Sequence, residues 1–149
     1  MELAKKDKDI ILITGDVGFS YFEVFIEKFP KQFINCGIME QTMMGLAAGL
    51  ALAGKKPYVY SMINFVTMRC YEQLRNDVCY HNANVKVIGV GGNSYYGFYG
   101  FSHNIEKDED LKIINHLPNI KCYTPETGEQ VKETILSTYA YEGPAYIRL

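Results

Sequence analysis

The sequence is poor in the features that mark several classes of protein. It has no tryptophan, only 3 histidines in 149 residues and a net charge of −2. Lysine and arginine are scattered along the chain, so the basic patch typical of a nucleic-acid-binding protein is missing. The longest apolar run, residues 43–53, is interrupted by glycines and falls short of the ~18 residues that a membrane span needs. The first residues are polar and lack the apolar core of a signal peptide, so we expect a cytoplasmic protein that binds neither nucleic acid nor membrane.

The cysteines indicate neither a disulfide framework nor a metal site. None of the four belongs to a CxxC pair, and each lies in an apolar or helical stretch, which predicts buried free thiols at Cys36, Cys70, Cys79 and Cys122. The histidines are not spaced with them as zinc ligands would be. Tyrosine, by contrast, is abundant, and several of the 12 cluster in YYGFYGF. Amphipathic aromatics without a field of charge suggest a protein interface or an organic ligand.

Short β-branched runs alternate with helical stretches along the whole chain, which predicts one domain over residues 1–149. Strands are expected at residues 10–14, 33–35, 58–61, 85–90, 121–123 and 145–148. Helices are expected at residues 21–28, 40–53, 65–80, 110–116 and 127–141. This alternation is typical of an α/β fold, with a parallel twisted sheet and helices on both faces. Ligands of such sheets bind beyond the carboxyl ends of the strands, so the loops at 15–20, 36–40, 61–65 and 91–103 are the candidate site.

Glu40 stands at the start of a helix made almost wholly of apolar and small residues, in GIMEQTMMGLAAGLALAG. The ordinary role of a carboxylate there is to interact with the helix dipole. At the mouth of the sheet and ahead of an apolar helix, however, Glu40 would be partly removed from water. A carboxylate in that setting is suited to share a proton with a ring nitrogen.

The stretch GDVGFSYFEVFIEKFPKQFINCGIMEQTMMGLAAGLALAGKKPYVYSMINFVTMRCYEQLRNDV resembles the pyrimidine-binding domain of transketolases, especially those split into two chains. The resemblance continues through the strand VKVIGV, the GxSH loop and the final GPAYIRL. It implies the thiamine diphosphate-binding, pyrimidine-domain fold. It also implies a transketolase subunit that transfers a two-carbon ketol unit between sugars, either sugar phosphates or unusual sugars, and that supplies the pyrimidine-side half of the active site.

The same resemblance implies roles for the cofactor-binding residues. Glu40 would hydrogen-bond the aminopyrimidine ring of thiamine diphosphate and favour the imino tautomer that deprotonates the thiazolium carbon. Phe65, which could otherwise be an ordinary core aromatic, would stack on that ring. Met62 and Met68 stand where transketolases often carry aromatics, and their sulfur atoms would still pack against it. Three further residues are implied to lie near the cofactor: Asp16, Val17 and Ile38.

The substrate side is implied by three residues. Ser20 would lie near the phosphate of the acceptor, and His103 would contact the substrate and transfer protons, although it could also be a surface histidine. Arg69 would face the substrate or pair with Glu72 on its own helix. A second active-site histidine of many transketolases is absent, and Gly91-Gly92-Asn93 stands in its place.

The chain lacks the GDG motif with which transketolases hold Mg²⁺ and the diphosphate. The resemblance therefore implies a partner, the N-terminal diphosphate-binding subunit, that supplies the Mg²⁺ site. Gly45 and Gly49 lie on the helix that follows Glu40, where glycine costs about 1 kcal/mol relative to alanine. They would permit close approach either to another subunit, which we expect in a self-associating assembly, or to the chain's own sheet.

Two other functions are compatible with the sequence. The first is a different thiamine diphosphate enzyme, similar to deoxyxylulose phosphate synthase or to the β-subunit of a 2-oxoacid dehydrogenase. The second is a non-catalytic assembly module that keeps the fold and the interface. The motif GIMEQ followed by the GxSH loop favours transketolase over the first, and the presence of Glu40 and Phe65 favours an enzyme over the second.

Overall fold

One parallel sheet forms the centre of the protein. The computed structural model describes residues 1–92 and 95–149, so the prediction made for Asn93 lies outside the described residues. Six parallel strands pair in the order β2-β1-β3-β4-β6-β5. They are β1 (Ile10–Thr14), β2 (Phe33–Asn35), β3 (Lys56–Met62), β4 (Lys86–Val90), β5 (Lys121–Tyr123) and β6 (Ala145–Arg148). The predicted α/β fold with a parallel sheet is confirmed.

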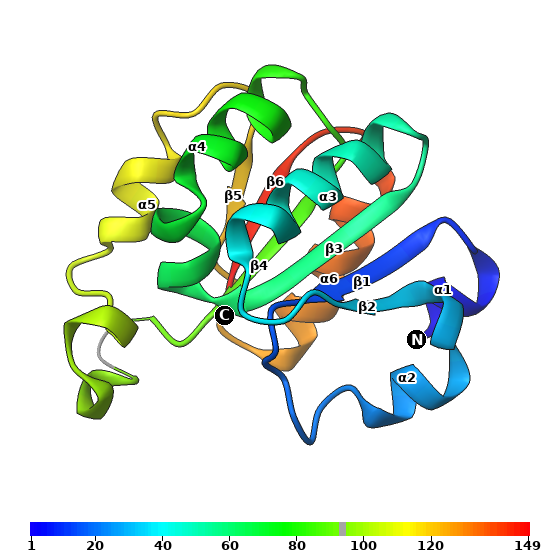
Figure 1. The fold of residues 1–149 in the computed structure, drawn as a ribbon, viewed down its shortest axis with the longest axis horizontal. Helices are drawn as coiled ribbons and strands as arrows, with labels where there is room; N and C mark the ends of the chain where they lie inside the picture. The colour runs from blue at the N-terminus through cyan, green and yellow to red at the C-terminus, as the bar shows by residue number, and fades with distance from the viewer. Residues whose placement is uncertain (93–94) are drawn as a thin grey trace.

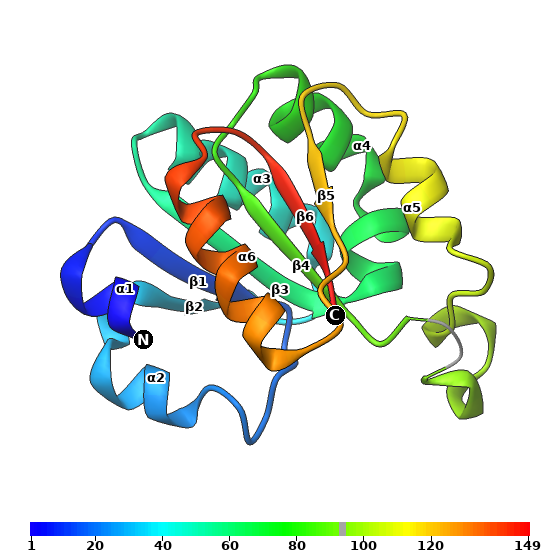
Figure 2. The same ribbon diagram turned by 180° about the vertical axis from the view of Figure 1, so that it is seen from behind.

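Helices cover both faces of the sheet (Figures 1 and 2). The face seen in Figure 1 carries α3 (Glu40–Leu52), the segment formed by η2 (Phe65–Arg69), α4 (Tyr71–Gln73) and η3 (Leu74–Tyr80), and α5 (Glu109–Ile114). The face seen in Figure 2 carries α1 (Glu2–Lys6), α2 (Glu23–Lys28) and α6 (Gly128–Ala140). Short 3-10 turns complete the chain at η1 (Pro30–Gln32), η4 (Gly97–Tyr99) and η5 (Phe101–His103). Within the described ranges, no helix has the length and apolar character needed to cross a membrane.

The period-2 alternation of the central strands divides the core into two layers. In β1, Ile11 and Ile13 join the cluster under α3, whereas Ile10 and Leu12 join the cluster under α6. All five residues of β1 are buried, as expected for a central strand of a parallel sheet that is covered on both faces. Burial of these aliphatic side chains is the main force that holds the layers together.

Several elements differ from the sequence predictions, among them β3, α2 and α1. Strand β3 begins at Lys56 and includes Pro57, which pairs with Ile11 of β1 before β4 joins at Tyr58, so its missing N–H costs no bond to β4. Helix α2 begins at Glu23 rather than at residue 21, because Ser20 adopts a left-handed φ of 69° and donates its N–H to Glu23 Oε1 at 2.7 Å. The short helix α1, whose Ala4 is buried, was not predicted.

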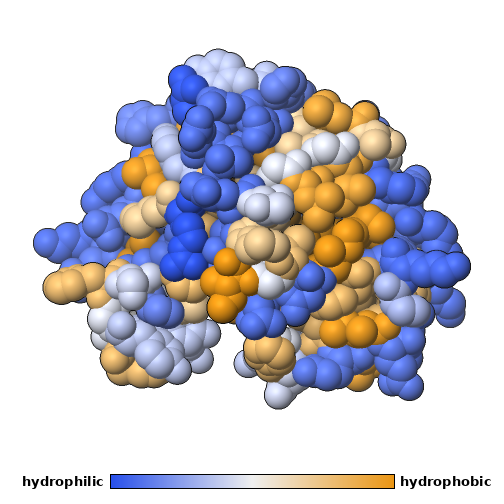
Figure 3. All heavy atoms as spheres, in the orientation of Figure 1, coloured by the Kyte–Doolittle hydropathy of each residue, from blue (hydrophilic) through white to orange (hydrophobic). Residues whose placement is uncertain are grey.

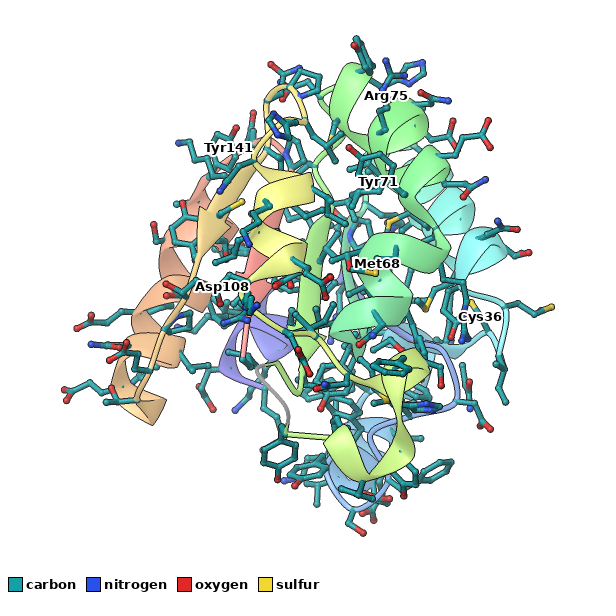
Figure 4. The ribbon with its side chains drawn as sticks, turned by 90° about the vertical axis from the view of Figure 1, so that its left-hand side faces the viewer. Cys36, Met68, Tyr71, Arg75, Asp108 and Tyr141 are labelled. Carbon is teal, nitrogen blue, oxygen red and sulfur yellow. The ribbon has the colours of Figure 1, made fainter. Side chains whose placement is uncertain are left out.

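The segment 65–80 was predicted as one α-helix, but it winds as π-helical turns on both sides of α4. Side chains bond to carbonyl groups within the first of these turns: Thr67 Oγ1 donates to Ile63 O at 2.6 Å, and Cys70 Sγ lies 3.2 Å from Phe65 O. Tyr71, labelled in Figure 4, ties this segment to α5 through a 3.2 Å bond from its hydroxyl to Ile113 O. Wide turns of this kind are frequent at functional sites.

The four cysteines are free thiols, but only two are buried. Burial raises the pKa of Cys70 and of Cys79 to about 12. Cys36 and Cys122 are half-buried, because they lie at and near the edge strands β2 and β5, and in this respect the prediction was wrong.

Two charged side chains anchor the amino-terminal side of the sheet. Lys86 is 1% exposed, and its ammonium group donates to Asn84 Oδ1, Tyr141 O and Gly143 O at 2.6–2.7 Å. The carboxylate of Asp7 accepts from Lys56 Nζ at 2.7 Å and from the Tyr139 hydroxyl at 2.9 Å. These bonds tie β3 and β4 to the ends of α1 and α6.

Candidate functional site

The loops that follow the strands gather at one edge of the sheet, the lower edge in Figure 1. The space-filling view shows a notch at this edge, between the loop that contains residues 95–103 and the loop that contains residues 15–22 (Figure 3). Both loops carry residues that the sequence singled out. Two of the predicted loops therefore face each other across the notch.

Asn35, at the end of β2, fixes the first two of the predicted loops to each other. Its Oδ1 accepts the N–H groups of Asp16 at 3.0 Å and Gly37 at 2.9 Å, and its Nδ2 donates to Asp16 Oδ1 at 3.1 Å. Asp16 adopts a left-handed φ of 59°, a conformation that aspartate tolerates better than most residues. The sequence analysis missed Asn35, although an asparagine between a strand and a glycine turn is a recognisable turn signal.

Glu40 is the first residue of α3, directly after the second of these loops. Its side chain is only 2% exposed, and an added Cβ on Gly15 would come within 3.7 Å of its Cγ. The positive end of the α3 dipole favours a carboxylate at this position. Its charged partner is Arg69, whose Nη1 donates to Glu40 Oε1 at 3.0 Å. The predicted removal of Glu40 from water is confirmed.

Arg69 connects Glu40 to Phe65. The guanidinium carbon lies 3.8 Å from the centre of the Phe65 ring, which places the cation against the aromatic face. Phe65 is 8% exposed, whereas the Arg69 side chain is 41% exposed. Arg69 therefore pairs with Glu40 and not with Glu72, the residue on its own helix that the sequence offered as a partner.

His103 closes the group from the opposite loop. Its ring packs edge-on against Phe65, with ring centres 5.1 Å apart and an interplanar angle of 77°. Ser102 Oγ lies 2.8 Å from its Nδ1. The loop is held in place by Asn64, whose Nδ2 donates to Asn104 O at 2.7 Å. His103 is therefore half-buried and packs against the group formed by Glu40, Arg69 and Phe65.

Comparison with known proteins identifies the family to which this chain belongs. The family described as "Transketolase, pyrimidine binding domain" matches residues 1–149. The chain belongs to this family. A subunit of the apulose-4-phosphate transketolase of Phocaeicola vulgatus is 35% identical over 150 residues, which cover 100% of this chain and 47% of that protein. A putative transketolase C-terminal section of Methanocaldococcus jannaschii is 34% identical, with the same coverage of both chains.

A solved structure described as "Split gene transketolase, inactive beta4 tetramer" superposes with a TM-score of 0.85 at 34% identity. The superposition covers 99% of this chain and 47% of that one. The transketolase pyrimidine-binding domain described here thus spans about half the length of the relatives it matches.

The remaining predicted residues of this transketolase domain are absent from the described hydrogen bonds and ring contacts of the group formed by Glu40, Arg69, Phe65 and His103. Met62 ends β3, and Met68 is exposed on η2 beside Arg69 (Figure 4). Ile38 is 70% exposed on the turn before α3. Val17 is half-buried, and the Ser20 backbone bonds to Glu23. Within the described residues, the hydrogen bonds of Asp16 and Ser20 are made to Asn35 and Glu23 and not to the Glu40 group.

Helix α3 of the domain turns an uncovered apolar face to the outside. A Cβ added to Gly45 or to Gly49 would meet nothing within 4 Å, so close packing on the chain's own sheet does not explain these glycines. Apolar residues gather over α3 in Figure 3, and the exposed ones there and on the preceding turn are Ile38, Met39, Leu46 and Leu52. The face that carries both glycines is open to another chain.

Proposed function

We propose that this chain is the pyrimidine-side subunit of a thiamine diphosphate-dependent transketolase, which transfers a two-carbon ketol unit between sugars. One observation carries the proposal. The buried Glu40 carboxylate accepts an N–H from a planar cation that is stacked on Phe65. A carboxylate and an aromatic face arranged around one planar nitrogen group are the two contacts that an aminopyrimidine ring requires.

The cofactor roles follow from this fit. Glu40 binds the ring nitrogen and holds the proton that the two share, Phe65 stacks on the ring, and Met62 and Met68 pack beside it. When bound there, thiamine diphosphate would supply the nucleophile and the electron sink for ketol transfer. We assign the lining of the cleft near the cofactor to Asp16, Val17 and Ile38.

The substrate roles fall to residues at the mouth of the notch. We assign proton exchange with a sugar hydroxyl to the His103 ring, which Ser102 orients through Nδ1. We assign contact with the acceptor to Ser20, which is exposed on the β1–α2 loop, and Arg69 is the cation that pairs with Glu40. The relative named for apulose 4-phosphate keeps phosphorylated ketoses among the candidate substrates.

A partner chain is part of the proposal. The sequence has no GDG motif, so the Mg²⁺ and diphosphate half of the site is assigned to a separate N-terminal transketolase subunit. The uncovered face of α3 is the surface we assign to association with the partner or with a second copy. The names of relatives, one a transketolase subunit and another a C-terminal section, support a divided enzyme.

The test is Glu40→Gln in the complex of this chain with its diphosphate-binding partner. The amide keeps the size and polarity of the side chain but cannot carry the shared proton. We expect thermal unfolding of the isolated chain to change little, while ketol transfer falls by about 100-fold or more. The control is Glu133→Gln, an exposed glutamate on α6, which should leave both measurements unchanged.

Three results would redirect the proposal. Near-normal ketol transfer by Glu40→Gln would remove the assigned role of the carboxylate. A complex that binds thiamine diphosphate but reacts with pyruvate in place of ketose donors would favour an enzyme similar to deoxyxylulose phosphate synthase or a 2-oxoacid dehydrogenase. A complex that forms but binds no thiamine diphosphate would leave the non-catalytic assembly module.

A further inference from the structure

The guanidinium of Arg69 makes contacts of the same kind as those required of the cofactor ring. It is planar, it donates an N–H to Glu40 Oε1 at 3.0 Å, and it lies 3.8 Å from the centre of the Phe65 ring. An aminopyrimidine is also planar, also carries N–H donors and also stacks on an aromatic face. We propose that Arg69 holds the place of the cofactor ring in the free chain and is displaced when the ring binds, an inference that rests on the function proposed above.

The two groups exclude each other on steric grounds. Phe65 is 8% exposed, with the Arg69 guanidinium over one face and the His103 ring at its edge. A second planar group needs a separation of about 3.5–4 Å from that face, which is the layer that Arg69 already fills. Glu40 is 2% exposed, and the Arg69 guanidinium already occupies the position from which a donor reaches its Oε1. A ring that contacts both residues therefore requires Arg69 to leave.

The Glu40 carboxylate has a compensating partner both before and after the cofactor ring replaces Arg69. A buried carboxylate without a partner is strongly unfavourable, so the free chain needs a donor at this place. Arg69 supplies the donor first, and an N–H of the bound ring supplies it afterwards. Only chains in which Arg69 has left Glu40 and Phe65 can bind the ring. The apparent affinity for the cofactor is therefore the intrinsic affinity multiplied by the fraction of such chains.

The surroundings of Arg69 allow the movement. Its side chain is 41% exposed, and it is the last residue of the π-helical turn η2. Glu72 is exposed and lies three residues further along the same segment. Side chains three residues apart on a helical segment come within reach of each other. Once displaced, Arg69 can pair with Glu72 on the exposed side of the same segment.

The experiment measures cofactor affinity and stability separately, with Arg69→Met as the main variant. Methionine keeps much of the side-chain length but has neither the charge nor the N–H donors. In the complex with the diphosphate-binding partner, titration calorimetry with thiamine diphosphate should give a dissociation constant about threefold to tenfold lower than that of the wild type. The isolated variant should unfold at a lower temperature than the wild type, since Glu40 loses its partner.

The matched control is Arg75→Met. Arg75 is also exposed, and its guanidinium carbon lies 4.6 Å from the centre of the Tyr80 ring, but it donates its hydrogen bonds to Asn76 and Tyr80. This variant should leave the dissociation constant of the complex unchanged. An equal gain in affinity from Arg75→Met would show a general effect of removing charge and would overturn the inference.

The outcomes separate the inference from the proposed function. A wild-type complex that binds no thiamine diphosphate overturns the proposed function and the inference with it. Binding by the wild type, together with an unchanged or weaker affinity for Arg69→Met, overturns the inference alone. A double-mutant cycle between Glu40→Gln and Arg69→Met on the isolated chain requires no cofactor, and additive losses in unfolding temperature would also overturn it.

Discussion

Charged side chains withdrawn from water are compensated in different ways at different places in this protein. Lys86 is surrounded by three oxygen acceptors and makes no ion pair among the described contacts, whereas Asp7 combines one cation with one hydroxyl donor. Glu40 has a single, partly exposed cation as its described partner. The compensation is therefore firm for Lys86 and Asp7, at the amino ends of the strands, and exchangeable for Glu40, where a ligand is expected.

At the residue scale, Asp7→Asn should make the protein less resistant to unfolding by about 1 kcal/mol at neutral pH. The hydrogen bond from Lys56 is the main reason that the pKa of Asp7 is lowered from 3.8 to about 2. A carboxyl group with a lowered pKa stabilises the folded state above its unfolded pKa, and this contribution is lost as the pH falls from 3.8 towards 2. Urea unfolding across this range measures it.

The difference between wild type and Asp7→Asn should therefore shrink as the pH falls and vanish near pH 2. Asp9→Asn is the control, because Asp9 pairs with Lys55 at 2.7 Å but is half exposed, and such pairs contribute little. A constant difference at all pH values would show that the charge of Asp7 is not the cause.

At the scale of the elements, helix α6 shows a capping arrangement. Thr127 Oγ1 accepts the N–H of Gln130 at 3.2 Å, and Gln130 Oε1 accepts the N–H of Glu126 at 2.7 Å. The side chains of Thr127 and Gln130 thus each accept a backbone N–H that the helix itself leaves without a partner at its start. The α6 helix contributes Ile135 and Tyr139 to the core on its face of the sheet, so its start affects the whole layer.

We expect Thr127→Ala to lower the free energy of unfolding by about 1 kcal/mol, because the cap is lost. Thr127→Ser keeps the hydroxyl and should unfold close to the wild type. Urea unfolding of the two variants at the same pH gives the comparison. Equal stability of the alanine and serine variants would mean that the 3.2 Å bond contributes nothing measurable.

The elements also show what the sequence could and could not specify. Strand β1 and the start of α3 at Glu40 were predicted, because an apolar run and a helix after a glycine turn are local signals. The start of β3 was not, since Pro57 is tolerated only because β4 joins one residue later. The pairing of Arg69 with Glu40 joins residues 29 apart and depends on the wide turn of η2, which no local pattern indicated.

At the scale of the whole molecule, apolar surface is open beside α6 and over α3. A cavity of about 660 Å³ between α1, α2 and α6 is lined by Ile10, Leu12 and Tyr58 of the sheet. The outer face of α3 carries the exposed Leu46 and Leu52 together with both glycines, and apolar residues gather over this helix in Figure 3. An apolar patch of this kind marks an interaction site on a protein surface. Small residues in its centre allow a second backbone to approach closely.

We expect Gly49→Leu to block association without harming the isolated chain. An added Cβ meets nothing within 4 Å here, and replacement of a helical glycine favours the helix. Native mass spectrometry with and without the diphosphate-binding partner should show loss of the assembly, while thermal unfolding is unchanged or improved. Gly128→Leu on α6, where an added Cβ also meets nothing within 4 Å, is the control and should leave assembly intact.

Chemical modification of Lys86 would report how fast the fold opens around this side chain. Burial lowers the pKa of its amine to about 8, so at mildly alkaline pH more of this amine is unprotonated and nucleophilic than in an ordinary lysine. Yet it is 1% exposed behind Tyr141 and Gly143, and an acylating reagent cannot reach it in the closed molecule. Acylation of Lys86, followed by peptide mass spectrometry, would therefore time the separation of β4 from the end of α6.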